Sequence, residues 1–327
     1  MIDTKDKKLL LAISDDARGS LKKIARQARV SREVADYRIK KLEELDIIRG
    51  YQARVDLSLF IHGAYMLLLQ LKKIDEKKEK EIINVLKKLN YVHWIGKTSG
   101  EYDLLITFSI KKISDLSTNL NRIFDSFGEN IKHYSILTIV KEFKDTFAPL
   151  FTKESESKKS IIREFPIEKP KIDNIDKEII RILGKKAKTT NREISKKLKL
   201  TEEAIRYRIK NLEKKNIIMS YRTIINVNKL SQFYFLMFNF SKLDSNNERK
   251  LDAYFRLHNN ITFANRTIGE YSVIAVVFAK ETKEFNEIIQ DIRNKFSDIL
   301  DKFNTMIIFE TVEHNHVPEG FIWKIIH

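Results

Sequence analysis

Two nearly identical heptapeptides, YRIKKLE at 37–43 and YRIKNLE at 207–213, contain residue types that can bind DNA phosphates and the edges of bases. Arg and Lys neutralise DNA phosphates, and Arg, Asn and Glu hydrogen-bond to base edges in the major groove. In the first copy Ala35, Ile39 and Leu42 stand at i, i+4 and i+7, which predicts a helix packed by its apolar face. The polar residues then occupy the opposite face, so the pattern indicates a helix that presents nucleic-acid-binding groups.

Positive charge is concentrated around these heptapeptides. The formal net charge is +16; residues 1–60 hold 14 basic and 10 acidic residues (+4), and residues 172–230 hold 16 and 7 (+9). The other 208 residues carry only +3. A basic helix face is often only a solvated surface. The confinement of the positive charge to two segments nevertheless favours a polyanionic partner, with nucleic acid preferred over an anionic membrane surface.

The heptapeptides belong to a long internal repeat. Shifted by 170 positions, residues 6–60 align without a gap to the segment that begins at Asp176, and GEYD at 100–103 aligns with GEYS at 269–272 at a shift of 169. This period exceeds the roughly 20–50 residues of solenoid repeats, so it indicates a duplicated module. The segment between the copies is charged and contains Ser and two Pro, which is typical of a linker.

The sequence of each module predicts two domains, and the predicted fold class is α+β. The first domain has three short helices, a tight turn before the third helix and a following strand, which is a winged helix-turn-helix pattern. Ser31 and Thr201 are suited to cap the third helices. The second domain reads β-α-β-β-α-β, the ferredoxin-like order. The predicted boundaries are 1–60 and 61–145 for the first module, 146–171 for the linker, 172–230 and 231–313 for the second module, and 314–327 for a C-terminal tail.

Residues 6–60 and 176–230 resemble the winged helix-turn-helix of the Lrp/AsnC (feast/famine) transcription regulators. The matching features are an Asp before an apolar helix, Arg-Ile-x-x-Leu-Glu in the third helix, and the Ile-Ile-x-x-Tyr that follows. The family usually has Gly before Ile-Ile. Here the residues are Asp46 and Asn216, which can take the same left-handed conformation. The βαββαβ domain is similar to the family's ligand-responsive domain, which dimerises through its sheets and binds small effectors, often amino acids.

The resemblance implies a sequence-specific transcription regulator of an archaeal or bacterial cytoplasm that binds double-stranded DNA. We expect DNA contacts from the second and third helices of each copy, with the recognition helix at base edges and the preceding cations at phosphates. In the first copy the predicted residues are Lys22, Arg26, Ser31, Arg32, Asp36, Tyr37, Arg38, Lys40 and Lys41. In the second copy they are Arg192, Lys196, Thr201, Glu202, Arg206, Tyr207, Arg208 and Lys210.

The resemblance also implies sheet-to-sheet dimers, so we expect the two ferredoxin-like domains to pack within one chain as a pseudo-dimer. That would hold the recognition helices about 34 Å apart, matching successive major grooves. Arg32 aligns with Glu202, and Asp36 aligns with Arg206. Because Arg prefers guanine and Glu prefers cytosine, the sequence predicts an asymmetric operator. Whole chains are also expected to be able to associate further through these sheets.

A small-molecule effector is a weaker expectation. GEYD fits the family's Gly-x-x-Asp turn, although a Gly-containing hairpin turn is common in any fold. Ser272 replaces the Asp in the second copy, so an effector site there would be changed or lost. The candidate effector-binding residues are Gly100, Tyr102, Asp103, Gly269 and Tyr271.

An enzyme is the main alternative class. Siroheme decarboxylases have a similar two-domain build and would need a tetrapyrrole pocket with basic and His residues. The seven histidines are scattered and do not repeat between the copies, and no set of acid, base and nucleophile stands out. We therefore expect neither an enzyme nor a cofactor. An interaction module whose DNA reading has decayed is a third class, against which the Lys and Arg of both third helices argue.

Other site types are disfavoured. His314 and His316 could hold a metal only with further ligands that the sequence does not identify. The chain has no Cys, which excludes disulfides and thiolate sites and fits a reducing cytoplasm. No run of about 18 apolar residues predicts a membrane span, and the charged N-terminus lacks a signal-peptide pattern.

Overall fold

The computed structural model describes residues 2–14, 16–152, 161–162, 170–315, 317 and 320. The chain forms two compact units, and each unit contains parts of both sequence copies. One unit holds the helix-turn-helix segments, residues 1–62 and 165–226 with the C-terminal residues 314–327. The other holds the ferredoxin-like segments, residues 63–164 and 227–313. The division therefore follows domain type rather than the order of the copies.

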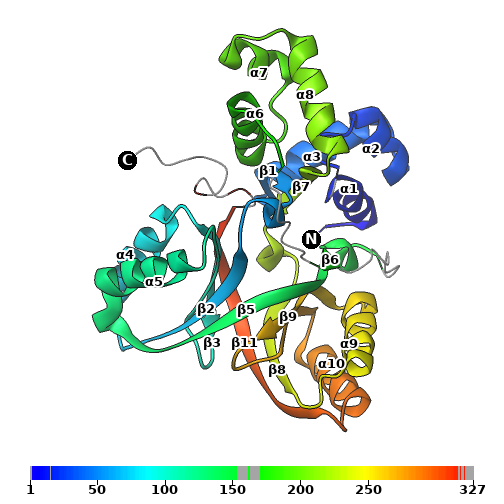
Figure 1. Cartoon of the computed structure of the whole chain (residues 1–327). Helices are drawn as coiled ribbons and strands as arrows, with labels where there is room; N and C mark the ends of the chain where they lie inside the picture. Colours follow the sequence, from blue (N-terminus) through cyan, green and yellow to red (C-terminus); the bar gives the residue numbers. More distant parts are fainter. Residues whose placement is uncertain are drawn as a thin grey trace. The chain divides into compact units, whose positions relative to one another are not determined.

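The helix-turn-helix unit repeats three helices and a strand (Figure 1). The first copy supplies α1 (Thr4–Ser14), α2 (Leu21–Ala28), α3 (Arg32–Glu44) and β1 (Ile48–Val55). The second copy supplies α6 (Asn174–Lys185), α7 (Asn191–Leu198), α8 (Glu202–Lys214) and β7 (Ile218–Ile225). Asp46 and Asn216 both have φ of 54°, so the left-handed conformation predicted after the third helix is confirmed.

The strand after each third helix, which the sequence predicted as a wing, finds its partner in the other copy. β1 pairs with β7 in an antiparallel two-stranded sheet, with Gln52 opposite Arg222. These two residues are themselves 170 positions apart, so the ladder is centred on equivalent residues of the two copies. The prediction of a strand after each third helix is confirmed, and the structure adds its partner, because each strand forms its hydrogen bonds with the strand of the other copy.

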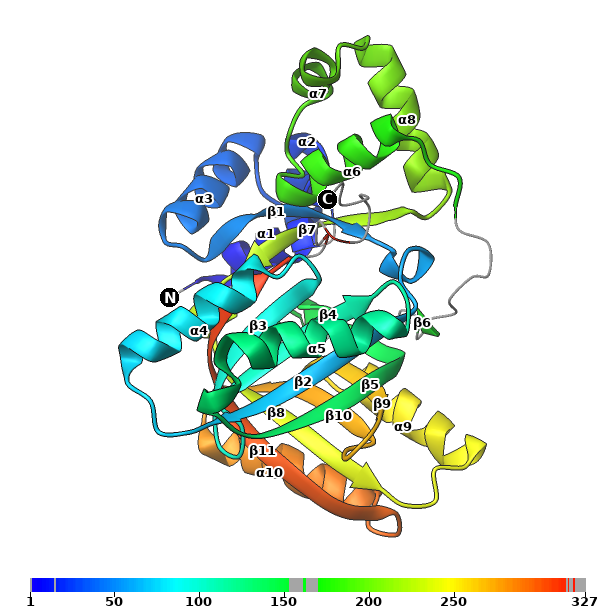
Figure 2. The ribbon, with the colours of Figure 1, turned by 60° about the vertical axis from the view of Figure 1, so that its left-hand side comes forward.

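The ferredoxin-like unit contains two βαββαβ motifs, as predicted (Figure 2). The first consists of β2 (Gly63–Leu71), α4 (Glu76–Lys88), β3 (Val92–Ser99), β4 (Leu104–Ile110), α5 (Ser114–Phe127) and β5 (Ile131–Asp145). The second consists of β8 (Gln232–Phe240), α9 (Ser245–Leu257), β9 (Ile261–Ile268), β10 (Val273–Ala279), α10 (Thr282–Lys295) and β11 (Leu300–His314). The helices α4 and α5 lie against the first set of strands, and α9 and α10 lie against the second (Figure 1).

The strands of the two motifs join into one sheet. Its order is β2-β4-β3-β11-β8-β10-β9-β5-β6, and β2 also pairs with β5, so every strand but β6 (Ile161–Ile162) belongs to a closed ring. Between the second set of strands and its helices lies a core that includes Leu236, Phe238, Phe255 and Ile292, each at most 1% exposed. Such burial of large apolar side chains is the main stabilising contribution to this unit.

The predicted linker and tail are described only in part. Within 146–171, Ala148–Leu150 forms a 3-10 turn, and Ile161–Ile162 pairs with Lys141 and Glu142 of β5. In the tail, the buried Val317 lies against Gly184 of α6. Residues 153–160 and 163–169 of the linker and residues 316, 318–319 and 321–327 of the tail lie outside the described ones.

Asp103, a predicted effector residue, has a structural role at the end of β2. Its carboxylate accepts the N–H of Leu71 at 2.7 Å. In the second copy the hydroxyl of Ser272 accepts the N–H of Phe240 at 2.8 Å. The two residues thus accept equivalent backbone hydrogen bonds, so the change from Asp to Ser preserves this structural role.

Replacing Asp103 with Ser should change the free energy of unfolding by less than about 0.5 kcal/mol, because Ser already serves the equivalent position. Asp103→Ala should cost about 1–3 kcal/mol, because the N–H of Leu71 loses its acceptor in a partly buried site. Urea titration of the two variants beside the wild type measures both values. Equal midpoints for the Ser and Ala variants would contradict this role.

Candidate nucleic-acid interface

The two third helices, α3 and α8, begin at capped tight turns. Arg29 and Lys199, which end the preceding helices, have left-handed φ values of 57° and 55°. Ser31 then accepts the N–H of Val34 at 3.2 Å, and Thr201 accepts that of Ala204 at 3.1 Å. The helix-turn-helix geometry predicted from the sequence is therefore present in both copies. The predicted DNA-binding residues Ser31 and Thr201 serve as N-caps.

One face of each third helix is packed and the other is open to solvent. Ile39 and Ile209 are 7% and 5% exposed, whereas Tyr37 and Tyr207 are 65% and 73% exposed. Neither tyrosine has a hydrogen bond within the described part of the chain. The other predicted contact residues that are exposed are Lys22, Arg26, Ser31, Arg32, Lys40, Lys41, Arg192, Lys196, Thr201, Arg206 and Lys210.

The open faces differ in charge between the copies. In α3, Lys40 forms an ion pair with Asp36 at 2.7 Å, which neutralises part of the face. The equivalent residues of α8 are Arg206 and Lys210, two cations. Within the described residues Arg206 has no ion pair, and Glu202, half-exposed one turn before it, has none either. The two copies therefore present different donor and acceptor patterns to a groove.

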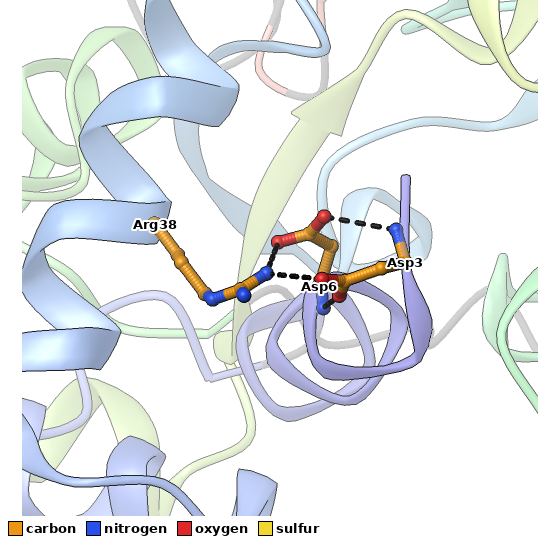
Figure 3. Close-up of polar contacts among 3 residues, drawn as sticks. All are labelled: Asp3, Asp6 and Arg38. Carbon is orange, nitrogen blue, oxygen red and sulfur yellow. Dashed lines mark hydrogen bonds and ion pairs between the residues drawn. The ribbon is translucent and has the colours of Figure 1, made fainter. Parts of the chain in front are cut away.

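Arg38 and Arg208, both predicted to bind DNA, form ion pairs within the protein. Figure 3 shows those of Arg38. Arg38 Nη1 lies 2.7 Å from Asp3 Oδ2 and 2.8 Å from Asp6 Oδ1. Arg208 makes the same contacts to Asp173 and Asp176, both at 2.8 Å. About three quarters of each arginine side chain is buried. These arginines tie the third helix to the start of the first, a role that the sequence analysis had not assigned to them.

The partners of these arginines also repeat in the sequence, although the sequence analysis did not pair them with the arginines. Asp3 and Asp6 recur as Asp173 and Asp176 at the same shift of 170 as the arginines. Glu43 and Glu213, the last residues of the heptapeptides, were also missed. The hydroxyl of Tyr51 donates to Glu43, and that of Tyr221 donates to Glu213. Charged pairs that repeat together at one shift are the pattern that could have revealed these contacts.

The remaining effector candidates lie where the two halves of the ferredoxin-like unit meet. Tyr102 and Tyr271 are buried, and their hydroxyls donate to Glu270 and Glu101, each at 3.2 Å. Burial raises the pKa of Tyr271 to about 12. Gly100 and Gly269 have φ of 142° and 138°, and a Cβ on Gly269 would stand 2.8 Å from the carbonyl oxygen of Ile136. Glycine is thus required in these turns whether or not an effector binds.

Other site types find little support in the described residues. They contain no group of three or more His, Cys, Asp and Glu side chains that could hold a metal ion. Of the two histidines considered for a metal, only His314 is among them. Among the same residues, no helix is long and apolar enough to cross a membrane.

Known proteins match both copies of this arrangement. The model of the family described as winged helix-turn-helix DNA-binding matches residues 2–49 and 172–219. The HTH-type transcriptional regulator LrpA of Pyrococcus horikoshii is 32% identical over 123 residues, which are 37% of this chain and 84% of LrpA. The chain belongs to the Lrp/AsnC family of transcriptional regulators. The regulator Ptr1 of Methanocaldococcus jannaschii is 29% identical over 44% of this chain and 96% of its own length.

These Lrp-type relatives each match less than half of the chain, which fits a tandem duplication of the family's unit. A solved structure of the siroheme decarboxylase NirDL covers 97% of the chain and 94% of its own, with a TM-score of 0.62 at 14% identity. At that identity the likeness shows a shared fold alone. It extends over both copies, so the tandem fold is not peculiar to this chain.

Replacing Arg38 with Met should destabilise the protein above about pH 4 and progressively less toward pH 2. The backbone N–H of Asp6 and the Arg38 guanidinium lower the pKa of Asp3 from 3.8 to about 2. A lowered pKa contributes stability that is complete above the unfolded value and is lost as the pH falls through the folded one. Melting curves of wild type and variant from pH 6 to pH 2 measure the difference.

Lys41→Met is the matched control, because Lys41 is an exposed cation of the same helix with no ion pair in the described part of the chain. It should leave the melting temperature almost unchanged at every pH. A deficit of Arg38→Met that stayed constant down to pH 2 would contradict the assigned contacts.

Proposed function

We propose that this Lrp/AsnC-type regulator binds one asymmetric DNA site as an intrachain pseudo-dimer, with each helix-turn-helix reading a different half-site. The observation that carries the proposal is the pairing of β1 with β7, which joins two capped recognition helices within one compact unit. A homodimer needs a second chain for the same arrangement. Here the second recognition helix comes from the same polypeptide, and its sequence is free to differ.

The difference between the helices supports non-equivalent half-sites. Arg32 of α3 is exposed, and a guanidinium is well suited to the O6 and N7 acceptors of guanine. The equivalent Glu202 of α8 is an acceptor, suited to the amino group of cytosine. Arg206 places a guanidinium on α8 at the position where α3 has Asp36, which is paired with Lys40. Tyr37 and Tyr207 are common to both half-sites.

The phosphate contacts are expected to be unequal as well. The segment 172–230 carries +9 and the segment 1–60 carries +4. Lys22 and Arg26 of α2 and Arg192 and Lys196 of α7 are exposed cations on the helices that precede the recognition helices. Each phosphate contact releases counterions and steepens the salt dependence of binding. The second copy would therefore contribute the larger share of sequence-independent affinity.

A small effector, of amino-acid type, is proposed to act in the ferredoxin-like unit at the turns that contain Tyr102 and Tyr271. Their reciprocal hydrogen bonds to Glu270 and Glu101 link the two halves of that unit. A ligand with an ammonium group that competed for either carboxylate would alter this junction. Thermal-shift screening of the amino acids tests the idea, and sedimentation in their presence tests further self-association of whole chains.

A tetrapyrrole-dependent enzyme is the second candidate, because the likeness to NirDL extends over the whole chain. The visible spectrum of the purified protein titrated with iron uroporphyrin separates the two functions. Stoichiometric spectral shifts together with the absence of DNA preference would favour the enzyme. An unshifted spectrum together with selective DNA binding would favour the regulator.

Selection from random DNA should return a site with two half-sites of different sequence, because α3 and α8 present different side chains. Arg206→Ala should reduce discrimination at one or two positions of one half-site by about 1–3 kcal/mol per position and leave the other half-site unchanged. Binding of selected and scrambled sequences, measured by fluorescence anisotropy, gives these values.

Lys196→Ala is the comparison variant, since it removes a cation of α7 expected at a phosphate. It should weaken all sequences to a similar degree and lower the slope of log K against log salt by about 1. Recovery of a clean palindrome in the selection would overturn the asymmetric operator.

A further inference from the structure

The tyrosines of the repeated Ile-Ile-x-x-Tyr motif, Tyr51 in β1 and Tyr221 in β7, bridge the two copies. Each hydroxyl donates to the last residue of the heptapeptide in its own copy. Tyr51 donates to Glu43 of α3, and Tyr221 donates to Glu213 of α8 at 2.6 Å. Burial, reinforced by the neighbouring carboxylate, raises the pKa of both phenols, so each hydroxyl keeps its proton at neutral pH. Each recognition helix is thus fastened to its own strand.

The aromatic ring of each tyrosine receives a cation from the other copy. Lys188 Nζ lies 3.5 Å from the centroid of the Tyr51 ring and 3.6 Å from a carboxylate oxygen of Glu43. Arg18 Cζ lies 5.3 Å from the centroid of the Tyr221 ring. Both are cation–π geometries. Lys188 is in the turn between α6 and α7, and Arg18 is in the equivalent turn between α1 and α2.

Backbone contacts join the same elements. The N–H of Ala17 donates to the carbonyl of Tyr221, and the N–H of Ala187 donates to that of Tyr51, both at 2.7 Å. Ala17 and Ala187 directly precede the two cations. We call each set of Glu, Tyr and cation a clasp: Glu43, Tyr51 and Lys188 form one, and Glu213, Tyr221 and Arg18 form the other. Each clasp runs from a recognition helix to the helix-turn-helix of the other copy.

We propose that the two clasps fix the separation and relative orientation of the recognition helices, and that their residues thereby determine which spacing of DNA half-sites the protein accepts. This rests on the proposed function, because spacing matters only if both helices bind one site. None of the six residues needs to touch DNA. They act as positioning residues for the helices that do.

The β1–β7 sheet has only two strands, and α6 of the second copy packs on β1 while α1 of the first copy packs on β7. A two-stranded sheet by itself is marginally stable and can twist, so further contacts are needed to hold the two attached domains at a fixed angle. A clasp from each helix-turn-helix to the strand of the other copy restrains the twist of the sheet on both sides. The clasps are also unequal, because Arg18 additionally donates to Asn191 Oδ1 at 3.0 Å and to the carbonyl of Thr189 at 3.3 Å.

The direct test measures the distance between the recognition helices without DNA. The chain contains no Cys, so Glu44→Cys and Lys214→Cys place one nitroxide label on α3 and one at the equivalent position of α8. Double electron–electron resonance should give one narrow distance distribution for the protein with intact clasps. Removing the cations with Arg18→Ala and Lys188→Ala should broaden it. An unchanged distribution would overturn the proposal.

Two further variants distinguish loss of the clasps from misfolding of the protein. Tyr51→Phe with Tyr221→Phe keeps both rings and removes only the hydroxyls, so the packing is retained while the ties to Glu43 and Glu213 are lost. It should broaden the distribution in a protein with a native circular-dichroism spectrum. Lys186→Ala removes an exposed cation of the same turn outside the clasp and should leave the distribution as narrow as before.

A second arm measures binding to a set of DNAs in which the spacing between the half-sites varies by single base pairs. In the clasp variants, the ratio of affinities for the best spacing and for neighbouring spacings should fall about tenfold. The Lys186→Ala protein should keep the wild-type ratio. Wild-type protein without any spacing preference would refute the bipartite site of the proposed function. The label distances still decide the role of the clasps in that case, so the two failures are distinguishable.

Discussion

The antiparallel ladder between β1 and β7 is the interaction on which the helix-turn-helix unit depends. A strand needs a partner for its backbone hydrogen bonds, and among the described residues neither strand pairs with a strand of its own copy. Each helix-turn-helix is therefore completed by the other. The centring of the ladder on Gln52 and Arg222 makes the contacts reciprocal, so that Ala17 and Ala187 donate equivalent hydrogen bonds across the two copies.

The same principle holds in the ferredoxin-like unit. β5 pairs with both β2 of its own motif and β9 of the other, and the strands close into a ring. Within the eight described strands of the ring, closure pairs every strand on both sides, so the two motifs have no open edge at which to slip. Duplication within one polypeptide then fixes the pairing of two different halves. Two separate chains would instead be free to pair like with like.

The repeated heptapeptide combines architecture with recognition. Ile39 and Leu42 pack inward, Arg38 is held by Asp3 and Asp6, and Glu43 accepts from Tyr51. Tyr37, Lys40 and Lys41 remain on the open face. The heptapeptide is therefore repeated both for packing within the protein and for its open face, and only some of the basic side chains of the helix are available to DNA. Counting cations along the sequence overestimates their number.

The sequence predicted features that depend on local patterns. The apolar spacing in α3 and α8, the caps Ser31 and Thr201, and the left-handed Asp46 and Asn216 all follow from neighbours within a few residues. It did not predict the partner of β1 or the acceptors of Arg38, because these depend on which distant segments meet in space. The hydrogen bond of Asp103 was missed for the same reason, since its carboxylate accepts the N–H of Leu71 from a different strand.

The most direct test of the central claim, that one chain reads two unequal half-sites, is hydroxyl-radical footprinting of a complex whose stoichiometry is fixed by native mass spectrometry. The account predicts one chain per DNA, with two protected segments of different sequence centred about 10–10.5 base pairs apart on one face of the duplex. A single protected segment per chain, or two segments that appear only when two chains are bound, would contradict it.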